Sequence, residues 1–232
     1  MPRPLVTLFF PLLLAASVAS ASPLVVWVDP AGTVHARATD GDAEPVVLAS
    51  DACVATPALA TAPTAHLAIW TDCASHHAFG QIVASDGLPV GAPFEVSKES
   101  ASSPHVAFDG EVFLCAWETA QTIRAARVSL AGLVLDPSSI LLAAAPARHP
   151  ALAASPNGGF LVAWESWEQW PGDIYASRID ASGSASPAIA IATEPGGDQS
   201  PSVAWEEGGF TVTWQKSASE TWFSVSAMAR VE

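Results

Sequence analysis

The chain has few of the basic residues that bind nucleic acid. Of its 232 residues only nine are Lys or Arg, against 23 Asp or Glu, and its formal net charge is −14 at pH 7. Lys98 and Lys216 are the only lysines. Because phosphate contacts need clustered basic side chains, this balance argues against nucleic acid and anionic membrane surfaces as partners. We interpret the acidity as keeping an apolar chain soluble, with recruitment of a cationic partner as the alternative.

Long apolar runs are also scarce, and the one present lies at the N-terminus. Arg3 is followed by the apolar segment 5–16 and by the small-residue signal Ala19-Ser20-Ala21, a pattern typical of a secretory signal peptide. The run is shorter than the roughly 20 residues that span a bilayer, which argues against a membrane anchor. We therefore expect a signal peptide at 1–21, one secreted domain at 22–232 in the periplasm or outside the cell, and no membrane insertion after cleavage.

Beyond this segment, one short apolar pattern that ends on tryptophan recurs along the chain. Its clearest copy is 158–165, and the tryptophans of its copies are 43, 47, 47 and 50 residues apart. A fixed period of this length is typical of propellers and solenoids. The periodic tryptophans are Trp27, Trp70, Trp117, Trp164 and Trp214. They place the repeats at about 22–56, 57–103, 104–149, 150–200 and 201–232.

A complete repeat contains four strand patterns separated by turn residues. In the fourth repeat the predicted strands are 151–154, 160–164, 174–179 and 188–192. Asn157-Gly158 supplies the positive φ angles that a tight hairpin needs. The first repeat enters at its second strand and the last stops in its third, so the pattern predicts eighteen strands in all. Gly and Pro interrupt every window that has a helical period.

The strand that ends on tryptophan is apolar on both faces. In the fourth repeat Phe160, Val162 and Trp164 point one way, and Leu161 and Ala163 point the other. Such a strand must be covered on both sides. Four-stranded sheets stacked face to face around an axis satisfy that demand. The sequence therefore predicts an all-β protein, a β-propeller of about five four-stranded blades with incomplete first and last blades.

The repeat can also be compared with known families. Its pattern, Pro-x-Val-Ala…Gly-Gly-Phe-x-Val-x-Trp…(Ile/Val)-x-Ala-x-Arg-(Val/Ile)…Gly, resembles the propeller-like repeats of large secreted bacterial surface proteins. In repeat length and blade count it is similar to five-bladed lectins of the tachylectin type. The resemblance covers 24–232 and rests on packing residues, so it implies a fold and carries over no ligand-binding residue. The arginine of the third strand is aligned at Arg37, Gln81, Arg127, Arg178 and Arg230.

The three cysteines differ in their places within the repeat. Cys53 lies at a repeat boundary and Cys73 follows Trp70, and in a four-stranded up-and-down blade both positions fall on the same rim. In an oxidising compartment this predicts a Cys53–Cys73 disulfide, with two free thiols as the alternative. Cys115 occupies an apolar strand position and is expected to be a small buried hydrophobe. The adjacent His76 and His77 suggest no metal site, and we expect no cofactor.

Aromatic residues supply the candidate binding site. The five periodic tryptophans are expected to fill the space between blades, because every repeat needs them. Extra tryptophans occur where the connection between the second and third strands is long, and polar residues flank them. Indoles can stack on a sugar ring while polar groups bind its hydroxyls, so this rim is a candidate carbohydrate site; the alternative is that the indoles cap their own blades or meet a neighbouring subunit. The candidate residues are Trp167, Trp170, Trp222, Glu168, Gln169 and Asp173.

Catalysis has less support in the sequence. Propeller glycosidases need two facing carboxylates, about 5 to 9.5 Å apart. The predicted inner strands carry no acid, and Asp109 and Glu206 lie beyond their ends in turns. The Ser-x-Asp-x-Gly-x-Thr-Trp box of sialidase-like propellers is absent. We therefore expect no enzymatic activity, and keep a hydrolase that uses Asp109 and Glu206 as an alternative.

Taken together, these features predict an exported, non-catalytic binding module that recognises a carbohydrate or a cell surface through its aromatic rim. The expected partner is a glycan or a surface protein. A structural module is the main alternative. In that case the incomplete terminal blades pair with another copy and bury the open strand edges that otherwise invite aggregation.

Overall fold

The protein is described here from a computed structural model that covers residues 23–39, 44–53, 56–144, 146–168, 172–217 and 224–231. The predicted signal peptide lies outside these ranges. The described residues form eighteen strands and no helix, so the all-β prediction is confirmed. No helix long and apolar enough to cross a membrane occurs in the described ranges.

The strands form five antiparallel sheets in chain order. Three sheets have four strands, and the first and last have three each. The first two sheets contain β1 (Leu24–Val28), β2 (Val34–Ala38) and β3 (Val46–Ala49), then β4 (Ala58–Thr61), β5 (Ala65–Thr71), β6 (Ala78–Ala84) and β7 (Pro89–Glu95). The third contains β8 (Ser102–Phe108), β9 (Phe113–Thr119), β10 (Thr122–Val128) and β11 (Ile140–Ala143). The last two contain β12 (Ala147–Ala154), β13 (Phe160–Ser166), β14 (Asp173–Ile179) and β15 (Ile189–Ala192), then β16 (Gly197–Glu206), β17 (Gly209–Ser217) and β18 (Ser224–Val231).

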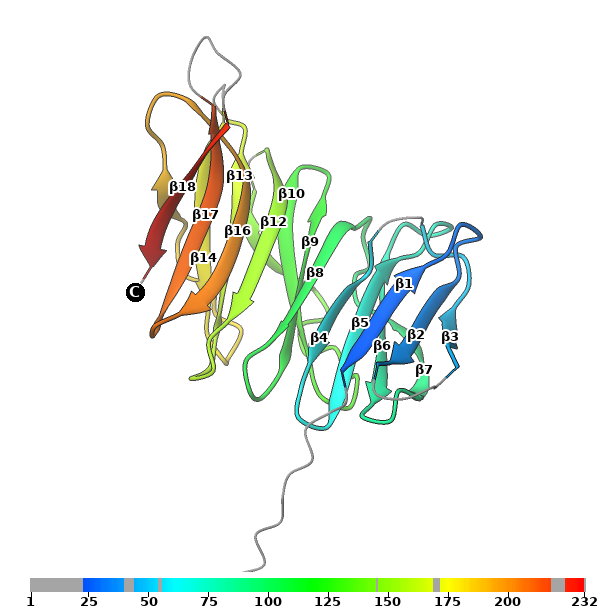
Figure 1. Cartoon of the computed structure of the whole chain (residues 1–232). Coiled ribbons are helices and arrows are strands. Elements are labelled where there is room, and N and C mark those ends of the chain that lie inside the picture. The colour runs from blue at the N-terminus through cyan, green and yellow to red at the C-terminus, as the bar shows by residue number, and fades with distance from the viewer. Residues whose placement is uncertain are drawn as a thin grey trace, which may run out of the picture.

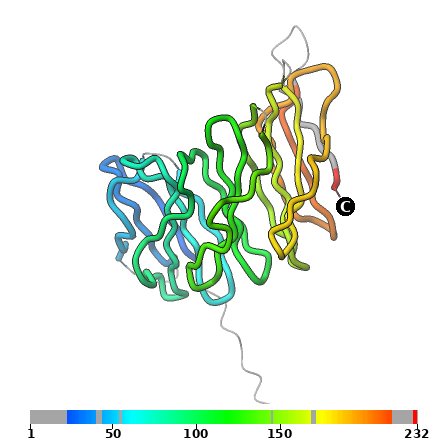
Figure 2. Tube along the Cα trace, turned by 180° about the vertical axis from the view of Figure 1, so that it is seen from behind, coloured from blue at the N-terminus to red at the C-terminus, as the bar shows by residue number. Residues whose placement is uncertain are grey.

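The five sheets stand side by side in the order of the chain (Figure 1). The first and the last sheet lie at opposite ends of the row, both in this view and from behind (Figure 2). Within the row, each of β4, β8 and β12 packs against the first strand of the next sheet. Each of the three middle sheets therefore meets its neighbours through its two faces, as blades of a propeller do.

Four apolar clusters fill the spaces between successive sheets. Between the fourth and fifth sheets, Leu161 and Ala163 of β13 meet Phe210 and Val212 of β17, and all four are buried. Between the third and fourth sheets, the opposite face of β13 packs on β9 and β10. The second strand of a sheet thus contributes to two clusters at once, which is why its sequence is apolar on both faces.

A bulge interrupts the first strand in each of the last three sheets. Each bulge lies where a residue with positive φ precedes a proline, and the strand register shifts there. Proline has no N–H for the ladder, so a central strand position would lose a hydrogen bond, whereas a bulge tolerates it. The pairs are Ser103-Pro104 (φ 48°), His149-Pro150 (φ 51°) and Ser200-Pro201 (φ 51°).

The strand pairing shows that the sequence alignment of the third-strand arginines is wrong by one residue in the first two repeats. Arg127, Arg178 and Arg230 each lie three positions after the residue that pairs with their sheet's tryptophan. Arg37 lies only two positions after His35, the partner of Trp27. Because side chains alternate along a strand, a one-residue shift moves a side chain to the other face. Arg37 therefore shares the face of Trp27, whereas the three later arginines face the next sheet or the end of the row. Gln81 shows the same two-residue offset from Phe79.

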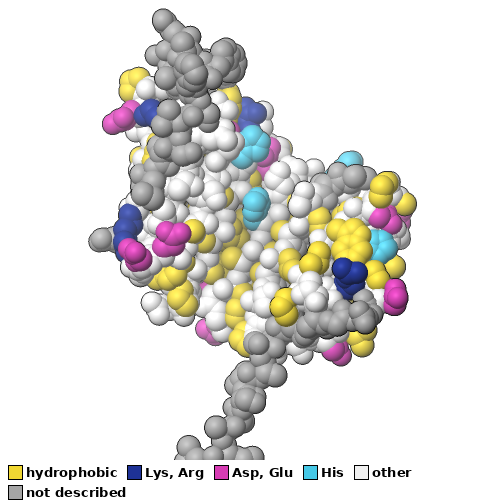
Figure 3. Space-filling model, in the orientation of Figure 1, with side chains coloured by type: hydrophobic (Ala, Val, Ile, Leu, Met, Phe, Trp, Pro, Cys, Tyr) yellow, Lys and Arg dark blue, Asp and Glu magenta, His cyan; other side chains and the backbone are white. Residues whose placement is uncertain are grey.

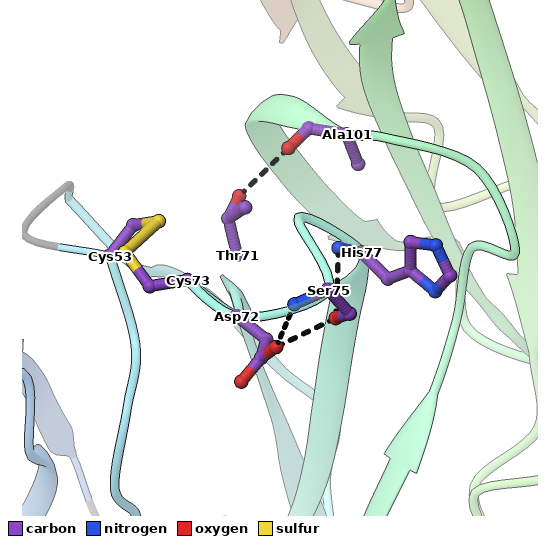
Figure 4. The surroundings of a disulfide bond; sticks show 7 residues. All are labelled: Cys53, Thr71, Asp72, Cys73, Ser75, His77 and Ala101. Atoms are coloured by element: carbon purple, nitrogen blue, oxygen red, sulfur yellow. Dashed lines mark hydrogen bonds between the residues drawn. A yellow bond between two sulfur atoms is a disulfide. The ribbon is translucent and has the colours of Figure 1, made fainter.

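The predicted disulfide between Cys53 and Cys73 is confirmed (Figure 4). It joins the segment after β3 to the connection after β5, and therefore links the first sheet to the second. Backbone hydrogen bonds support it, since the N–H of Cys53 donates to the carbonyl of Thr71 (2.8 Å) and the N–H of Cys73 donates to that of Asp51 (2.8 Å). A disulfide indicates a compartment other than the reducing cytoplasm.

The connection that carries Cys73 is ordered by its own polar side chains. Asp72 Oδ1 accepts hydrogen bonds from the backbone N–H and the hydroxyl of Ser75, both at 2.7 Å (Figure 4). Thr71 Oγ1 donates to the carbonyl of Ala101, the residue before the third sheet's first strand (3.1 Å). Cys115 is a free, buried thiol in the third sheet, and burial raises the pKa of this thiol. Its predicted role as a small buried hydrophobe agrees with this position.

Loss of the disulfide should lower stability without abolishing the fold. The bond closes a loop with a sequence separation of 20 residues, and the loop-entropy model gives a contribution of about 3 kcal/mol. We expect the double variant Cys53→Ser/Cys73→Ser to unfold at lower urea concentration, and reductant to shift the parent but not the variant. Mass spectrometry after alkylation under denaturing conditions supplies the control. One alkyl group should add before reduction, and the addition of three would contradict the bond.

Candidate functional site

Trp167, the first of the three candidate tryptophans, is held by contacts within its own sheet. It follows β13, and its backbone N–H donates to the carbonyl of Pro146 at the entry to that sheet (2.7 Å). Its indole N–H donates to Glu165 Oε2 (3.0 Å), and the guanidinium carbon of Arg148 lies 3.8 Å from the ring centroid. Cation–π contact of this kind covers one face of the indole. The residue therefore contributes to packing at the rim, and a role in ligand binding stays a prediction.

Glu168 and Asp173 lie on the same rim but differ in exposure. Glu168 is exposed, whereas Asp173 opens β14 and is half-buried. Glu168 also lines a groove of about 340 Å³ between the third and fourth sheets, together with Trp164, Tyr175 and Ser166. The other candidates, Gln169, Trp170 and Trp222, lie outside the described residues.

A buried carboxylate joins this rim to the fifth sheet. Glu165 is 1% exposed, and its Oε1 accepts a short hydrogen bond from the backbone N–H of Ser200, at the bulge of β16. His149 Nδ1 lies 3.0 Å from the same oxygen. In the preceding sheet, Glu118 Oε2 accepts from the backbone N–H of His149, at the bulge of β12 (3.1 Å). An acidic residue after the periodic tryptophan thus ties its sheet to the bulge of the next one.

These inter-sheet clamps were not predicted, although the sequence contains their signal. Both glutamates directly follow a periodic tryptophan. The carboxylate of each accepts a hydrogen bond from the backbone N–H of a residue that precedes a proline in the next repeat. A charged side chain is normally read as solvent-exposed, because burying it requires paired hydrogen-bond donors. The bulge supplies such a donor, since it takes a backbone N–H out of the strand ladder.

Asp198 is a second buried carboxyl group on this rim. Its Oδ1 accepts a hydrogen bond from the indole N–H of Trp214 (2.8 Å), and its Oδ2 is buried without a hydrogen-bond partner in the described part of the chain. Burial raises the pKa of this carboxyl group, the bond from Trp214 and the charge of Lys216 oppose the shift, and the charge of Asp173 adds to it. The periodic tryptophan of the fifth repeat is therefore anchored by a carboxyl group whose ionisation is disfavoured.

The two carboxylates considered for hydrolysis lie at strand ends in different sheets, and only Asp109 lies beyond its strand. Asp109 is in the third sheet and is buried; its Oδ1 accepts from the backbone N–H groups of Glu111 and Val112, both at 2.9 Å. Its Oδ2 accepts from the N–H of Gly159 in the fourth sheet (3.0 Å). Glu206 ends β16 in the fifth sheet and is exposed. Asp109 is thus occupied as a second kind of inter-sheet clamp, on the rim opposite to Glu165.

The five periodic tryptophans are placed at four inter-sheet boundaries and one outer face. Trp70, Trp117, Trp164 and Trp214 are buried, as the packing prediction requires. Trp27 is partly exposed and stacks on His35, with ring centroids 5.2 Å apart. Among the residues that the structure describes, no group of three or more His, Cys, Asp or Glu side chains is arranged to hold a metal ion.

Solved structures with a similar arrangement have propeller-type folds. A subtype N11 neuraminidase-like protein of A/flat-faced bat/Peru is 12% identical, with a TM-score of 0.50; the match covers 85% of this chain and 52% of that one. Hydrazine synthase of Kuenenia stuttgartiensis is 10% identical, with a TM-score of 0.50 and coverages of 86% and 77%. A GH43 endo-arabinanase from Bacillus licheniformis is 12% identical, with a TM-score of 0.45 and coverages of 75% and 69%.

No family model and no curated protein matches the chain. The chain spans about half the length of the neuraminidase-like protein. At these identities the likeness shows the fold alone, and it supports the all-β, propeller-type prediction.

The comparison contradicts the expected function. We predicted an exported, non-catalytic module for carbohydrate or cell-surface recognition, whereas the similar solved structures are mostly named as enzymes. Hydrazine synthase, with a TM-score of 0.50 and 10% identity, is one of them. The prediction failed because packing residues define this fold, and they do not distinguish its binding modules from its enzymes.

Replacing Asp198 by asparagine should stabilise the protein at neutral pH. A raised folded-state pKa means that stability is greatest below the ordinary aspartate pKa of about 3.9 and falls as pH rises through the folded-state pKa. Asp198→Asn removes that loss and keeps an acceptor for Trp214. We expect a higher Tm than the parent at pH 7, and equal Tm values near pH 3.5, by differential scanning calorimetry.

Asp180→Asn is the matched control with the opposite sign. A hydrogen bond from the Ser182 hydroxyl lowers the pKa of Asp180, so this variant should lose stability at pH 7 and the loss should shrink as pH falls through the folded-state pKa. An Asp198→Asn variant less stable than the parent at pH 7 would show that the carboxylate contributes more through its bond to Trp214 than burial costs.

Proposed function

We propose that this chain is an exported, propeller-type domain of five blades that works as a dimer, with the two copies joined through the outer face of the first sheet. One observation carries the proposal: the tryptophan that lies buried between sheets in four repeats lies, in the first, on a face that no other described sheet covers. Export is supported by the Cys53–Cys73 disulfide and by the predicted signal peptide at 1–21.

The outer face of the first sheet consists of side chains that point away from the second sheet. Its apolar members are exposed, Val25 by 46% and Val47 by 56%. In Figure 3, hydrophobic side chains gather with basic and histidine side chains over β1 and β2. Strand register assigns five residues to this face, namely Val25, Trp27, His35, Arg37 and Val47.

The repeat indicates what such a face normally does. In the later sheets the same face of the second strand packs against the preceding sheet, and its tryptophan is buried there. Trp27 stands at the same position, but no sheet precedes its own among the described residues. A residue that fills an interface in every other repeat is suited to fill one here, because exposed apolar clusters mark interaction surfaces.

The outer face of the last sheet has the opposite character. Thr211 and Thr213 occupy the positions that Leu161 and Ala163 hold in the fourth sheet, where the corresponding face is buried. Gln215 continues the polar row along β17 and is exposed. Repeat proteins use a polar outer face on a terminal repeat to end the stack. The last sheet is therefore capped, whereas the first is not.

The outer face of the first sheet carries charges that complement the same face of a second copy. Arg37 lies near one end of the face, opposite Val25, and Asp29 lies beyond the other end, after Val28. A two-fold axis through the region of Trp27 would bring Arg37 of each copy towards Asp29 of the other. Asp29 is held as an acceptor, because hydrogen bonds from His35 and the backbone of Thr33 lower its pKa. A two-fold dimer is the commonest closed assembly, and it needs only one kind of surface.

The expected affinity is modest. Full burial of a side chain of the size of Val contributes about 1.5–3 kcal/mol, and association costs of similar size offset much of the gain. A face of three short strands is small for a protein interface. We therefore expect a dissociation constant on the order of 10–100 µM, which corresponds to about 5.5–7 kcal/mol.

The proposal predicts a concentration-dependent mass that Trp27 controls. Sedimentation equilibrium of the mature protein should show a monomer–dimer equilibrium, and Trp27→Lys should shift it to monomer because a buried, unpaired ammonium opposes contact. Thr213→Lys on the last sheet is the matched control and should leave the equilibrium unchanged. Circular dichroism and the single free thiol verify that both variants fold.

Three results would contradict the proposed dimer. A parent that stays monomeric through the millimolar range has no such interface. A Trp27→Lys variant that dimerises like the parent places the interface elsewhere. Dissociation by Thr213→Lys, with species larger than dimers in the parent, indicates head-to-tail contact between first and last sheets.

A further inference from the structure

A cavity between the fourth and fifth sheets contains an arginine that has no ion-pair partner among the residues that the structure describes. The cavity has a volume of about 210 Å³ and is lined by Ser155, Gly159, Arg178, Asp180, Trp205 and Phe210, among others. It lies on the rim of the Asp109 clamp, away from Trp167. Arg178 Nη2 is buried and has no hydrogen-bond partner in the described part of the chain. A buried donor without a hydrogen-bond partner lowers the free energy of unfolding, so a bound group that accepts this hydrogen bond would stabilise the protein.

The equivalent arginine of the third sheet shows which partner is missing. Arg127 forms a two-pronged ion pair, with Nε 2.9 Å from Asp136 Oδ2 and Nη2 2.8 Å from Asp136 Oδ1. Asp136 Oδ2 also accepts the backbone N–H of Arg127 (2.8 Å), and the third guanidinium nitrogen, Nη1, donates to the carbonyl of Ala181 in the next sheet. One carboxylate thus satisfies most of the guanidinium, which is the geometry an arginine fork favours.

In the fourth sheet a proline stands in place of that aspartate. The N–H of Leu135 donates to the carbonyl of Arg127, and the N–H of Ser186 donates to that of Arg178, so Leu135 corresponds to Ser186. The next residue is Asp136 in one sheet and Pro187 in the other. Ser186 Oγ accepts the backbone N–H of Arg178 (3.0 Å), which replaces only one of the bonds made by Asp136.

The remaining walls of the cavity suit the apolar part of a ligand. The guanidinium carbon of Arg178 lies 5.3 Å from the ring centroid of Phe210, and Trp205 packs edge-on against the same ring, with centroids 4.8 Å apart. The Ser155 hydroxyl oxygen accepts the N–H of Asn157 (3.1 Å), and its own proton can donate. Asp180 is the acidic group at the cavity, and its Oδ1 is bound by Ser182 and by the backbone N–H of Ser184.

We propose that this cavity binds a ligand that carries a carboxylate next to an apolar or aromatic group, with the carboxylate paired to Arg178 as Asp136 is paired to Arg127. The site is independent of the dimer face, which lies at the other end of the row of sheets. Two kinds of molecule present this chemistry, a free aromatic acid and the C-terminus of a polypeptide that ends in an aromatic residue.

The test measures binding of two probes and their uncharged amides to the mature protein. Benzoate represents the free acid, and N-acetylphenylalanine represents the polypeptide C-terminus. Ligand-observed NMR titration should show saturable binding of at least one acid, and at least a tenfold weaker response to benzamide and N-acetylphenylalaninamide, since the amides lack the charge. The acid that binds more tightly identifies the source of the ligand.

Three variants assign any binding to Arg178. Arg178→Gln should weaken it at least tenfold. Pro187→Asp should do the same while keeping the arginine, because it supplies an internal carboxylate at the position of Asp136. Arg127→Gln, at the equivalent position of the neighbouring sheet, is the matched control and should bind like the parent.

The proposal fails if neither acid binds the folded parent at millimolar concentration. It also fails if the amides bind as well as the acids, or if Arg178→Gln retains the parent affinity. Should Arg178→Gln not fold, Pro187→Asp decides, and full affinity in that variant overturns the proposal.

Discussion

Burial of the second strand on both of its faces is the constraint on which the rest of this structure depends. Leu161 and Phe160 are adjacent in β13, yet they belong to clusters on opposite sides of the sheet. Since each such side chain contributes about 1.5–3 kcal/mol when buried, a strand of this kind is stabilised most when a sheet covers each of its faces. The carboxylates Asp109 and Glu165 then reinforce the stack, because each accepts a backbone N–H from the next sheet.

Much of this arrangement could be predicted from the sequence, because the tryptophan period and the turn residues are local signals. The strands, the incomplete end sheets and the Cys53–Cys73 bond follow from them. The register of the third strands does not follow from these local signals. Arg37 aligns with Arg127 in the repeat pattern but lies on the opposite face, because the number of residues between the tryptophan's partner and the arginine differs by one. An alignment of the repeat pattern is unaffected by a difference of one residue, whereas in a strand that difference moves the side chain to the other face of the sheet.

The candidate sites were harder to predict because their partners are distant in the chain. Trp167 was recognised as unusual, yet the Arg148 that covers its ring comes from the preceding strand. Asp198 is a charged residue near a turn, a position that normally indicates exposure, and only the stacked sheets show it beneath Trp214. In the repeat pattern Arg178 aligns with Arg37, Arg127 and Arg230 and is not distinguished from them. It has no ion-pair partner in the described part of the chain because Pro187 stands nine residues after it, where Asp136 stands nine residues after Arg127; the spacing is visible in the sequence, but the pairing of Arg127 with Asp136 is not.

The outer faces of the first and last sheets differ in polarity, and this difference determines where a further repeat would fit into the row of sheets. Because each sheet contacts only its neighbours, a copy of a middle repeat such as 150–200 would find both of its faces matched if it were inserted beside the original. A repeat added after the last sheet would meet Thr211 and Thr213 instead of an apolar surface. Gene duplication could therefore lengthen this protein from within, while its polar last sheet would oppose extension beyond the C-terminal end.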